Sequence, residues 1–147
     1  MNNLQRPGII SVGYCQAKKL QPDILDIYDE NAPMKIYGTI INIPINGIGS
    51  LDVTSETVKG STIYKTKATF NICGNDDDAK KICSILQKNI HSFIYITTEG
   101  KKILQGINEK PYPTVTSKYI SDDLPTGRRG YFIEVNYQNT HSFITLE

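Results

Sequence analysis

The dipeptide Lys59-Gly60 separates two long runs of alternating residues, "SLDVTSETV" and "STIYKTKATFNI". A glycine in this place suits a two-residue hairpin loop, because such loops need positive φ angles. Pairing Val58 with Ser61 places charged residues of both signs on one face and a mainly apolar set on the other. The charged face holds Asp52, Glu56, Lys65 and Lys67, and the other face holds Leu51, Val53, Tyr64, Ala68, Phe70 and Ile72. The pattern predicts a half-buried antiparallel ribbon.

Most of the remaining chain divides into short β-prone runs separated by turns. These runs cover residues 8–14, 34–45, 91–98, 101–108, 114–120 and 131–138. Pro44 favours an edge position or a strand end. Glu99-Gly100 predicts a second hairpin, and the last run predicts a face shared by Tyr131, Ile133, Val135 and Tyr137. The polar connector over 16–33 is expected to hold no more than a turn or two of helix.

The segment "GNDDDAKKICSILQKN" predicts one amphipathic helix, at about residues 75–88. Asn75 is a suitable N-cap, and the three aspartates that follow favour the positive end of the helix dipole. A narrow apolar stripe recurs at helical spacing and is expected to lie on the sheet. The stripe consists of Ala79, Ile82, Cys83 and Leu86.

Strands, one helix and further strands in this order predict an α+β protein with mainly antiparallel sheet, built as a sandwich or partly open barrel of about 7–8 strands. The 147 residues are the size of one ordinary domain. We therefore expect a single domain over 1–147, with an extended N-terminal segment (1–7) and an extended C-terminal segment (139–147).

The composition favours a globular protein over a disordered chain or a dedicated nucleic-acid binder. Hydrophobic residues make up 39% and charged residues 21%, which is too apolar for a disordered chain. Sixteen basic and fifteen acidic residues give a net charge of +1, which disfavours a dedicated nucleic-acid binder. No run is apolar enough to span a membrane, and the first residues do not resemble a signal peptide. Cys15, Cys73 and Cys83 are expected to be reduced thiols of a protein made in a cytoplasm.

The search for catalytic chemistry predicts a non-enzymatic protein without cofactor or metal. The sequence holds no GxSxG elbow, P-loop, dinucleotide fingerprint or HExxH. Its two histidines, His91 and His141, have no cysteine at metal-ligand spacing. The acidic run 76–78 is consecutive, unlike the alternating ligands of an EF-hand, and is better explained as a helix start.

Two further motifs each allow two interpretations. The loop "PTGRRG" places Arg128 and Arg129 between glycines, where they either clasp a phosphate or carboxylate or form a solvated loop. The segment "GINEKPYPTV" carries Pro111, Tyr112 and Pro113, which form either a loop presenting the tyrosine or a rigid corner between strands. We favour the corner, with the tyrosine held against the sheet or against a neighbouring subunit.

The order of these features, with "VGYC" near the start, "GKKILQGINEKPYPTV" after the second hairpin and "GYFIEVNYQNTHSF" near the end, resembles a known group of proteins. These are small structural proteins from the head–tail and tail modules of tailed phages and prophages of gut Bacteroidales, the crAss-like phages among them. The resemblance runs over most of the chain. It implies a virion protein, made in the host bacterial cytoplasm, that forms a cyclic oligomer as a head–tail connector, neck or tail ring.

The same resemblance implies partners and contacts. The partners would be copies of this chain and neighbouring portal, connector or tail subunits, with incidental contact with packaged DNA and no membrane. The candidate contact residues are Pro111, Tyr112, Pro113, Arg128, Arg129 and Phe143. The alternative is a small β-rich binding or regulatory domain that contacts nucleic acid or a ligand through the Arg128-Arg129 loop.

Overall fold

A computed structural model describes residues 8–16, 40–45, 47–72, 76–88, 91–107, 111–121 and 129–146. In chain order its elements are β1 (Gly8–Gln16), β2 (Ile41–Ile43), β3 (Gly49–Val58), β4 (Ser61–Ile72), α1 (Asp76–Leu86), β5 (His91–Thr97), β6 (Lys102–Gln105), β7 (Thr114–Ser121), β8 (Arg129–Asn139) and β9 (Ile144–Thr145). The predicted class, α+β with mainly antiparallel sheet, is confirmed. Within these ranges, no helix has the length and apolar character needed to cross a membrane.

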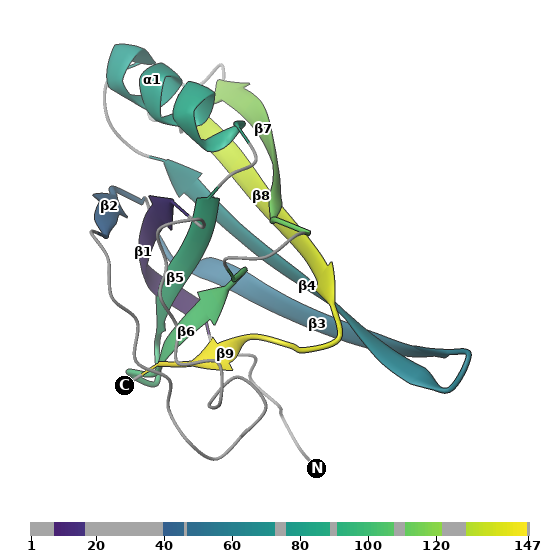
Figure 1. Ribbon diagram of the computed structural model, residues 1–147. Helices are drawn as coiled ribbons and strands as arrows, with labels where there is room; N and C mark the ends of the chain where they lie inside the picture. Colours follow the sequence, from purple (N-terminus) through teal and green to yellow (C-terminus); the bar gives the residue numbers. More distant parts are fainter. Residues whose placement is uncertain are drawn as a thin grey trace.

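The nine strands form one open antiparallel sheet in the order β7-β8-β4-β3-β1-β5-β6-β9, with β2 pairing with β1. The N-terminal strand β1 therefore lies in the middle, between β3 and β5 (Figure 1). The expected count of about 7–8 strands was slightly low, and the strands belong to one sheet, not to the two of a sandwich. β2 stops directly before Pro44, as predicted for a proline at a strand end.

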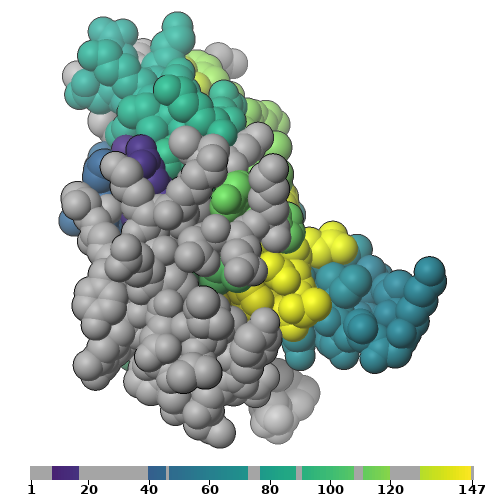
Figure 2. Space-filling model, viewed as in Figure 1, coloured from purple at the N-terminus to yellow at the C-terminus, as the bar shows by residue number. Residues whose placement is uncertain are grey.

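The β3–β4 hairpin has the predicted register, from Val58 opposite Ser61 to Asp52 opposite Lys67. Its turn uses Lys59 and Gly60, both at positive φ. On the apolar face the prediction holds only near the body of the protein, because Leu51 is buried whereas Val53 is 48% exposed. The pairing of β4 with β8 ends at Tyr64, and beyond it the hairpin projects as a two-stranded ribbon, seen at the lower right of Figure 1 and standing clear in Figure 2. Alternation predicted the face of Val53 correctly but could not show that nothing covers it.

Helix α1 spans Asp76–Leu86, within the predicted 75–88, and its apolar stripe packs on the sheet as expected. Ala79, Cys83 and Leu86 are buried in the main core. The helix end is tied to β7 by a hydrogen bond from Gln87 Nε2 to Ser117 Oγ (2.8 Å). Asn75, the predicted N-cap, lies outside the described residues.

The sheet curls so that its two halves face each other across the core. Gln105 on β6 is fully buried, although β6 is four places from β4 in the sheet order. Its Nε2 lies 3.0 Å from Thr66 Oγ1 on β4 and 3.3 Å from the Val135 carbonyl oxygen on β8. The predicted inner face of β8 is confirmed for Ile133, Val135 and Tyr137, which are all buried. Partly buried Tyr131 packs against the same core.

The C-terminal segment differs from the expected extended tail. After Asn139 the chain returns to the sheet, where β9 pairs with β6 and the Leu146 amide donates to the Lys102 carbonyl (2.7 Å). Ile144 and Leu146 are buried in a second apolar cluster, which explains why this tail folds back. The expected N-terminal segment 1–7 and the polar connector over 17–33 lie outside the described residues.

Candidate functional site

Gly106, just after β6, and Pro113, just before β7, are packed directly against each other. Gly106 has a φ of +97°, in a region that favours glycine. A Cβ at this position would lie 2.7 Å from Pro113 Cγ and 2.8 Å from its Cδ. Pro113 is buried, whereas Pro111 is exposed and Tyr112 is half-buried. The structure therefore supports the corner interpretation and still leaves Tyr112 accessible.

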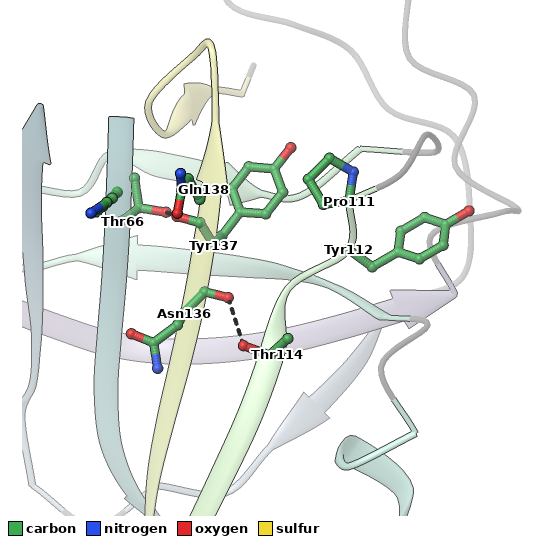
Figure 3. A pocket seen from close by; sticks show the side chains of 8 residues that line it. Thr66, Pro111, Tyr112, Thr114, Asn136, Tyr137 and Gln138 are labelled. Atoms are coloured by element: carbon green, nitrogen blue, oxygen red, sulfur yellow. Dashed lines mark hydrogen bonds between the residues drawn. The ribbon is translucent and has the colours of Figure 1, made fainter. Parts of the chain in front are cut away.

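This corner forms one wall of an open groove of about 570 Å³. Its lining residues are Lys65, Thr66, Pro111, Tyr112, Thr114, Asn136, Tyr137 and Gln138. Strands β4 and β8 supply one side and the segment leading into β7 supplies the other (Figure 3). The ring of Tyr137 stands beside Pro111, while the ring of Tyr112 points away from β8.

The groove exists because β8 extends past the point in the sheet at which its neighbour β7 begins. The first residue of β7, Thr114, lies opposite Asn136, and its Oγ1 donates to the Asn136 carbonyl (3.4 Å). β8 continues for three more residues, Tyr137–Asn139, and β4 is the described strand that pairs with them. Pro111 and Pro113 have no amide hydrogen, so this segment cannot extend the β7 ladder along them. A short stretch of strand edge thus stays open beside the corner.

A hydrogen-bonded chain orients Tyr137 at this edge. Asn139 Nδ2 donates to the Tyr137 hydroxyl (2.6 Å), which lies 3.2 Å from His141 Nε2. His141 Nδ1 is 3.0 Å from the Ser142 carbonyl, so in the neutral ring Nδ1 donates and Nε2 accepts from the tyrosine. The sequence pattern did not make His141 a metal ligand, and in the structure it supports the Tyr137 hydroxyl.

The groove carries little chemistry beyond hydrogen bonding and apolar contact. Its described lining residues include no carboxylate, histidine or cysteine, and Lys65 is the one charged side chain among them. The Lys65 ammonium lies 3.5 Å from a Glu56 carboxylate oxygen, and both side chains are about half exposed. Among the described residues, no group of three or more potential ligands is placed to hold a metal ion.

The other sequence candidates lie in different places. Arg128 is outside the described residues, and Arg129 begins β8 without a described side chain. Phe143 is half-buried and meets Tyr95 edge to face, with ring centroids 6.2 Å apart. The structure therefore brings Pro111, Tyr112 and Pro113 together at the groove and leaves Phe143 against the core.

The structure describes two of the three cysteines of the chain. Cys15 and Cys83 are free and buried, and Cys73 lies outside the described residues. Burial raises the pKa of the Cys15 thiol to about 11, and it also raises the pKa of the Cys83 thiol. Both thiols are therefore protonated and poorly nucleophilic at neutral pH, as expected of packing residues.

Sequence reasoning did not identify the buried polar cluster beneath the groove. The Tyr95 hydroxyl donates to Gln105 Oε1 (2.6 Å), and Thr66 Oγ1 donates to the Tyr137 carbonyl (3.3 Å). Complete burial raises the pKa of Tyr95 well above its ordinary value. The available signal was a single amide, Gln105, at the end of an apolar run, because such a group needs partners when it is buried.

Comparison with known proteins identifies no relative of this chain. No family model matches the sequence, and neither a curated protein nor a solved structure shows significant similarity to it. The function must therefore be inferred from the residues and their geometry.

Proposed function

We propose that this chain is a non-enzymatic structural protein of a tailed-phage virion, a subunit of a head–tail connector, neck or tail ring that assembles as a cyclic oligomer. The curled sheet, close to a partly open barrel, would serve as the rigid body of each subunit. Copies of the chain and adjacent portal, connector or tail proteins would be its partners. The resemblance of sequence order supplies the phage setting, and the structure supplies a feature that suits assembly.

The observation that carries the proposal is the projecting β3–β4 hairpin. From Val53 to its tip the β3 strand is exposed, and it includes the apolar side chains of Val53 (48% exposed) and Val58 (42% exposed). A two-stranded ribbon is marginally stable in water without a third strand or a packing surface. Natural proteins seldom leave a long strand edge unprotected, because it is a template for pairing with another chain. An arm of this kind is explained if a neighbouring subunit covers it.

The groove fits this function better than it fits catalysis. It is open, and its described lining consists of two tyrosines, a proline, Lys65 and neutral polar groups. Aromatic residues with few charges are typical of the central part of protein–protein interfaces. A closed ring forms when one surface of each subunit contacts a different surface of the next, and the rotation between neighbours brings the last subunit back to the first.

Mass photometry and negative-stain electron microscopy of the purified full chain test the proposal. We expect rings of one defined copy number, formed at high protein concentration or on addition of virion partners. Replacing Glu56–Ile63 by Asn-Gly shortens the arm at the paired positions Ser55 and Tyr64 and should abolish rings while the circular dichroism spectrum is retained. Lys80→Ala, on the exposed face of α1, is the control and should assemble normally.

Two results would contradict the proposal. One is absence of the protein from purified virions by mass spectrometry. The other is salt-dependent DNA binding by a permanent monomer, lost on joint replacement of Arg128 and Arg129 by alanine, which would favour a binding or regulatory domain.

A further inference from the structure

Four neighbouring strands, β7-β8-β4-β3, form a ribbon whose two outer edges have stretches that no other described strand covers. Among the described strands, β7 is the last in the sheet order and pairs only with β8. β3 pairs with β1 only through Gly49 and Ser50, so no described strand covers Leu51–Val58 on that side. Both free stretches are eight residues long.

We infer that the free edge of β3 in one copy pairs with β7 of the next copy, which continues the sheet from subunit to subunit. The inference rests on the proposed ring function and names the interface within it. The ribbon has four antiparallel strands, so its two outer strands run in opposite directions. Rotation about a ring axis keeps the direction of each strand along that axis, so β3 of one copy meets β7 of the next in antiparallel orientation. An odd number of strands would have required a parallel junction.

Full overlap of the two edges fixes a register with Val58 opposite Thr114 and Leu51 opposite Ser121. In this register Val53 lies opposite Tyr119. These side chains are 48% and 46% exposed in the isolated subunit, and both belong to the face that carries the core. A pair of one β-branched and one aromatic residue is among the favourable cross-strand pairs. A slip of one residue would turn the two side chains to opposite faces of the sheet, so the pleat excludes it.

The polar face of the same junction is also complementary. Glu56 lies opposite Thr116 and diagonal to Lys118, and all three side chains are exposed in the subunit. Diagonal neighbours across antiparallel strands are within reach of long side chains. The junction thus joins opposite charges on the polar face and two apolar side chains on the other.

The tip of the hairpin then reaches the groove. Lys59 and Gly60 follow Val58 and would continue past Thr114, toward Pro113 and Tyr112 of the neighbour. This is where β7 stops and the groove begins. The Lys59 ammonium can lie over the accessible ring of Tyr112 as a cation–π contact. The proline corner would thus act as the end stop that sets how far the arm extends.

The geometry of a closed ring is compatible with this register. Within one chain Thr114 aligns with Asp52, through Asn136 and Lys67, whereas the junction aligns Thr114 with Val58. Each subunit is therefore displaced by six residues, about 20 Å, across a ribbon about 19 Å wide. Strands tilted by about 45° to the ring axis accommodate this displacement, at the steep end of the range known for closed barrels.

Disulfide trapping tests the register directly. The variant Val53→Cys with Tyr119→Cys should form covalent ladders of the ring under mild oxidation, because opposed residues on paired strands have Cβ atoms close enough for a disulfide. Within one chain the two positions are about 24 Å apart, three strand spacings across and six residues along, so the bond can form only between copies. The native cysteines Cys15, Cys73 and Cys83 remain in both variants, and the wild-type protein measures the background that they give.

The matched control is Thr54→Cys with Tyr119→Cys, a slip of one residue that should give less than a tenth of the ladder. Ladders from Val53→Cys alone would show two β3 edges meeting and would overturn the inference. Hydrogen exchange on wild-type protein avoids any folding defect of a variant. The amides in 51–58 and 114–121 that point away from β4 and β8 should gain protection in the ring, whereas the alternate amides are already bonded within the subunit. If rings form but show neither the amide protection nor the disulfide ladder, the β3–β7 pairing is wrong and the proposed function stands. If no rings form, the pairing and the proposed function are both wrong.

Discussion

Replacing Gly106 and Gly100 separately by alanine measures how much the contact with Pro113 stabilises the corner beside the groove. Both glycines have positive φ, +97° and +82°. A new Cβ at Gly106 would overlap Pro113, whereas a new Cβ at Gly100 has no atom within 4 Å. Gly100→Ala therefore reports the backbone strain alone, and the difference between the two variants reports the overlap.

The magnitudes follow from these two contributions. A left-handed backbone costs about 1–2 kcal/mol for a residue with a Cβ. Forcing extra atoms into a packed contact costs about 1–3 kcal/mol more. We expect Gly100→Ala to lower the free energy of unfolding by about 1–2 kcal/mol and Gly106→Ala by about 2–5 kcal/mol, since the second variant carries both contributions. For a chain of this length, the second loss corresponds to a fall in Tm of about 6–15 °C.

Urea unfolding followed by circular dichroism gives the two free energies, and Pro113→Ala completes a double-mutant cycle. Removing the proline ring relieves the overlap but not the strained φ, so Gly106→Ala should cost about 1–3 kcal/mol less in the Pro113→Ala background. Effects of either substitution on the unfolded chain cancel in the cycle. Equal losses for the two glycine variants, or no coupling between Gly106 and Pro113, would refute the packed-corner explanation.

Three further outcomes are expected. Gln105→Leu should lower the free energy of unfolding by about 2–4 kcal/mol, because the buried Tyr95 hydroxyl loses its partner, and adding Tyr95→Phe should restore about 1 kcal/mol in chemical denaturation. Since the folded-state pKa of the Cys15 thiol is raised from 9.0 to about 11, its contribution to stability is fully present below pH 9 and is lost as pH rises toward 11. Cys15→Ala should therefore flatten the fall in stability measured over that interval, and an unchanged slope would contradict it. Tyr112→Ala should leave Tm within about 2 °C, because the side chain is half-buried at the surface, yet raise the concentration needed for ring formation severalfold in mass photometry.

Local patterns predicted the elements that are stabilised by near neighbours in sequence. The register of the β3–β4 hairpin followed from alternation and the Lys59-Gly60 turn, and the helix followed from its apolar spacing and acidic start. The exposure of Val53 was not predictable in this way, because alternation assigns a face without showing what covers it.

Features that depend on distant segments were largely missed. Gln105 is satisfied by groups on β4 and β8, which no pattern around it indicates. The Pro111–Pro113 corner was predicted from the restrictions of proline, but the open edge of β8 beside it depends on where β7 begins. The return of the C-terminal tail depends on an apolar cluster formed by β5, β6 and β9 residues.

The position of β1 in the middle of the sheet has a consequence for the order of folding. Ile9 pairs with Thr97, and Tyr64 pairs with Asn139, so the central pairings join segments that are far apart in sequence. Chains dominated by such pairings fold slowly, because the long loops must close before the contacts stabilise them. Among the described strands, β7 pairs with β8 alone, and β8 is synthesised long after the β3–β4 hairpin. A nascent chain can therefore display the hairpin arm before it can offer the edge that would receive one, which would delay assembly until β8 has been made.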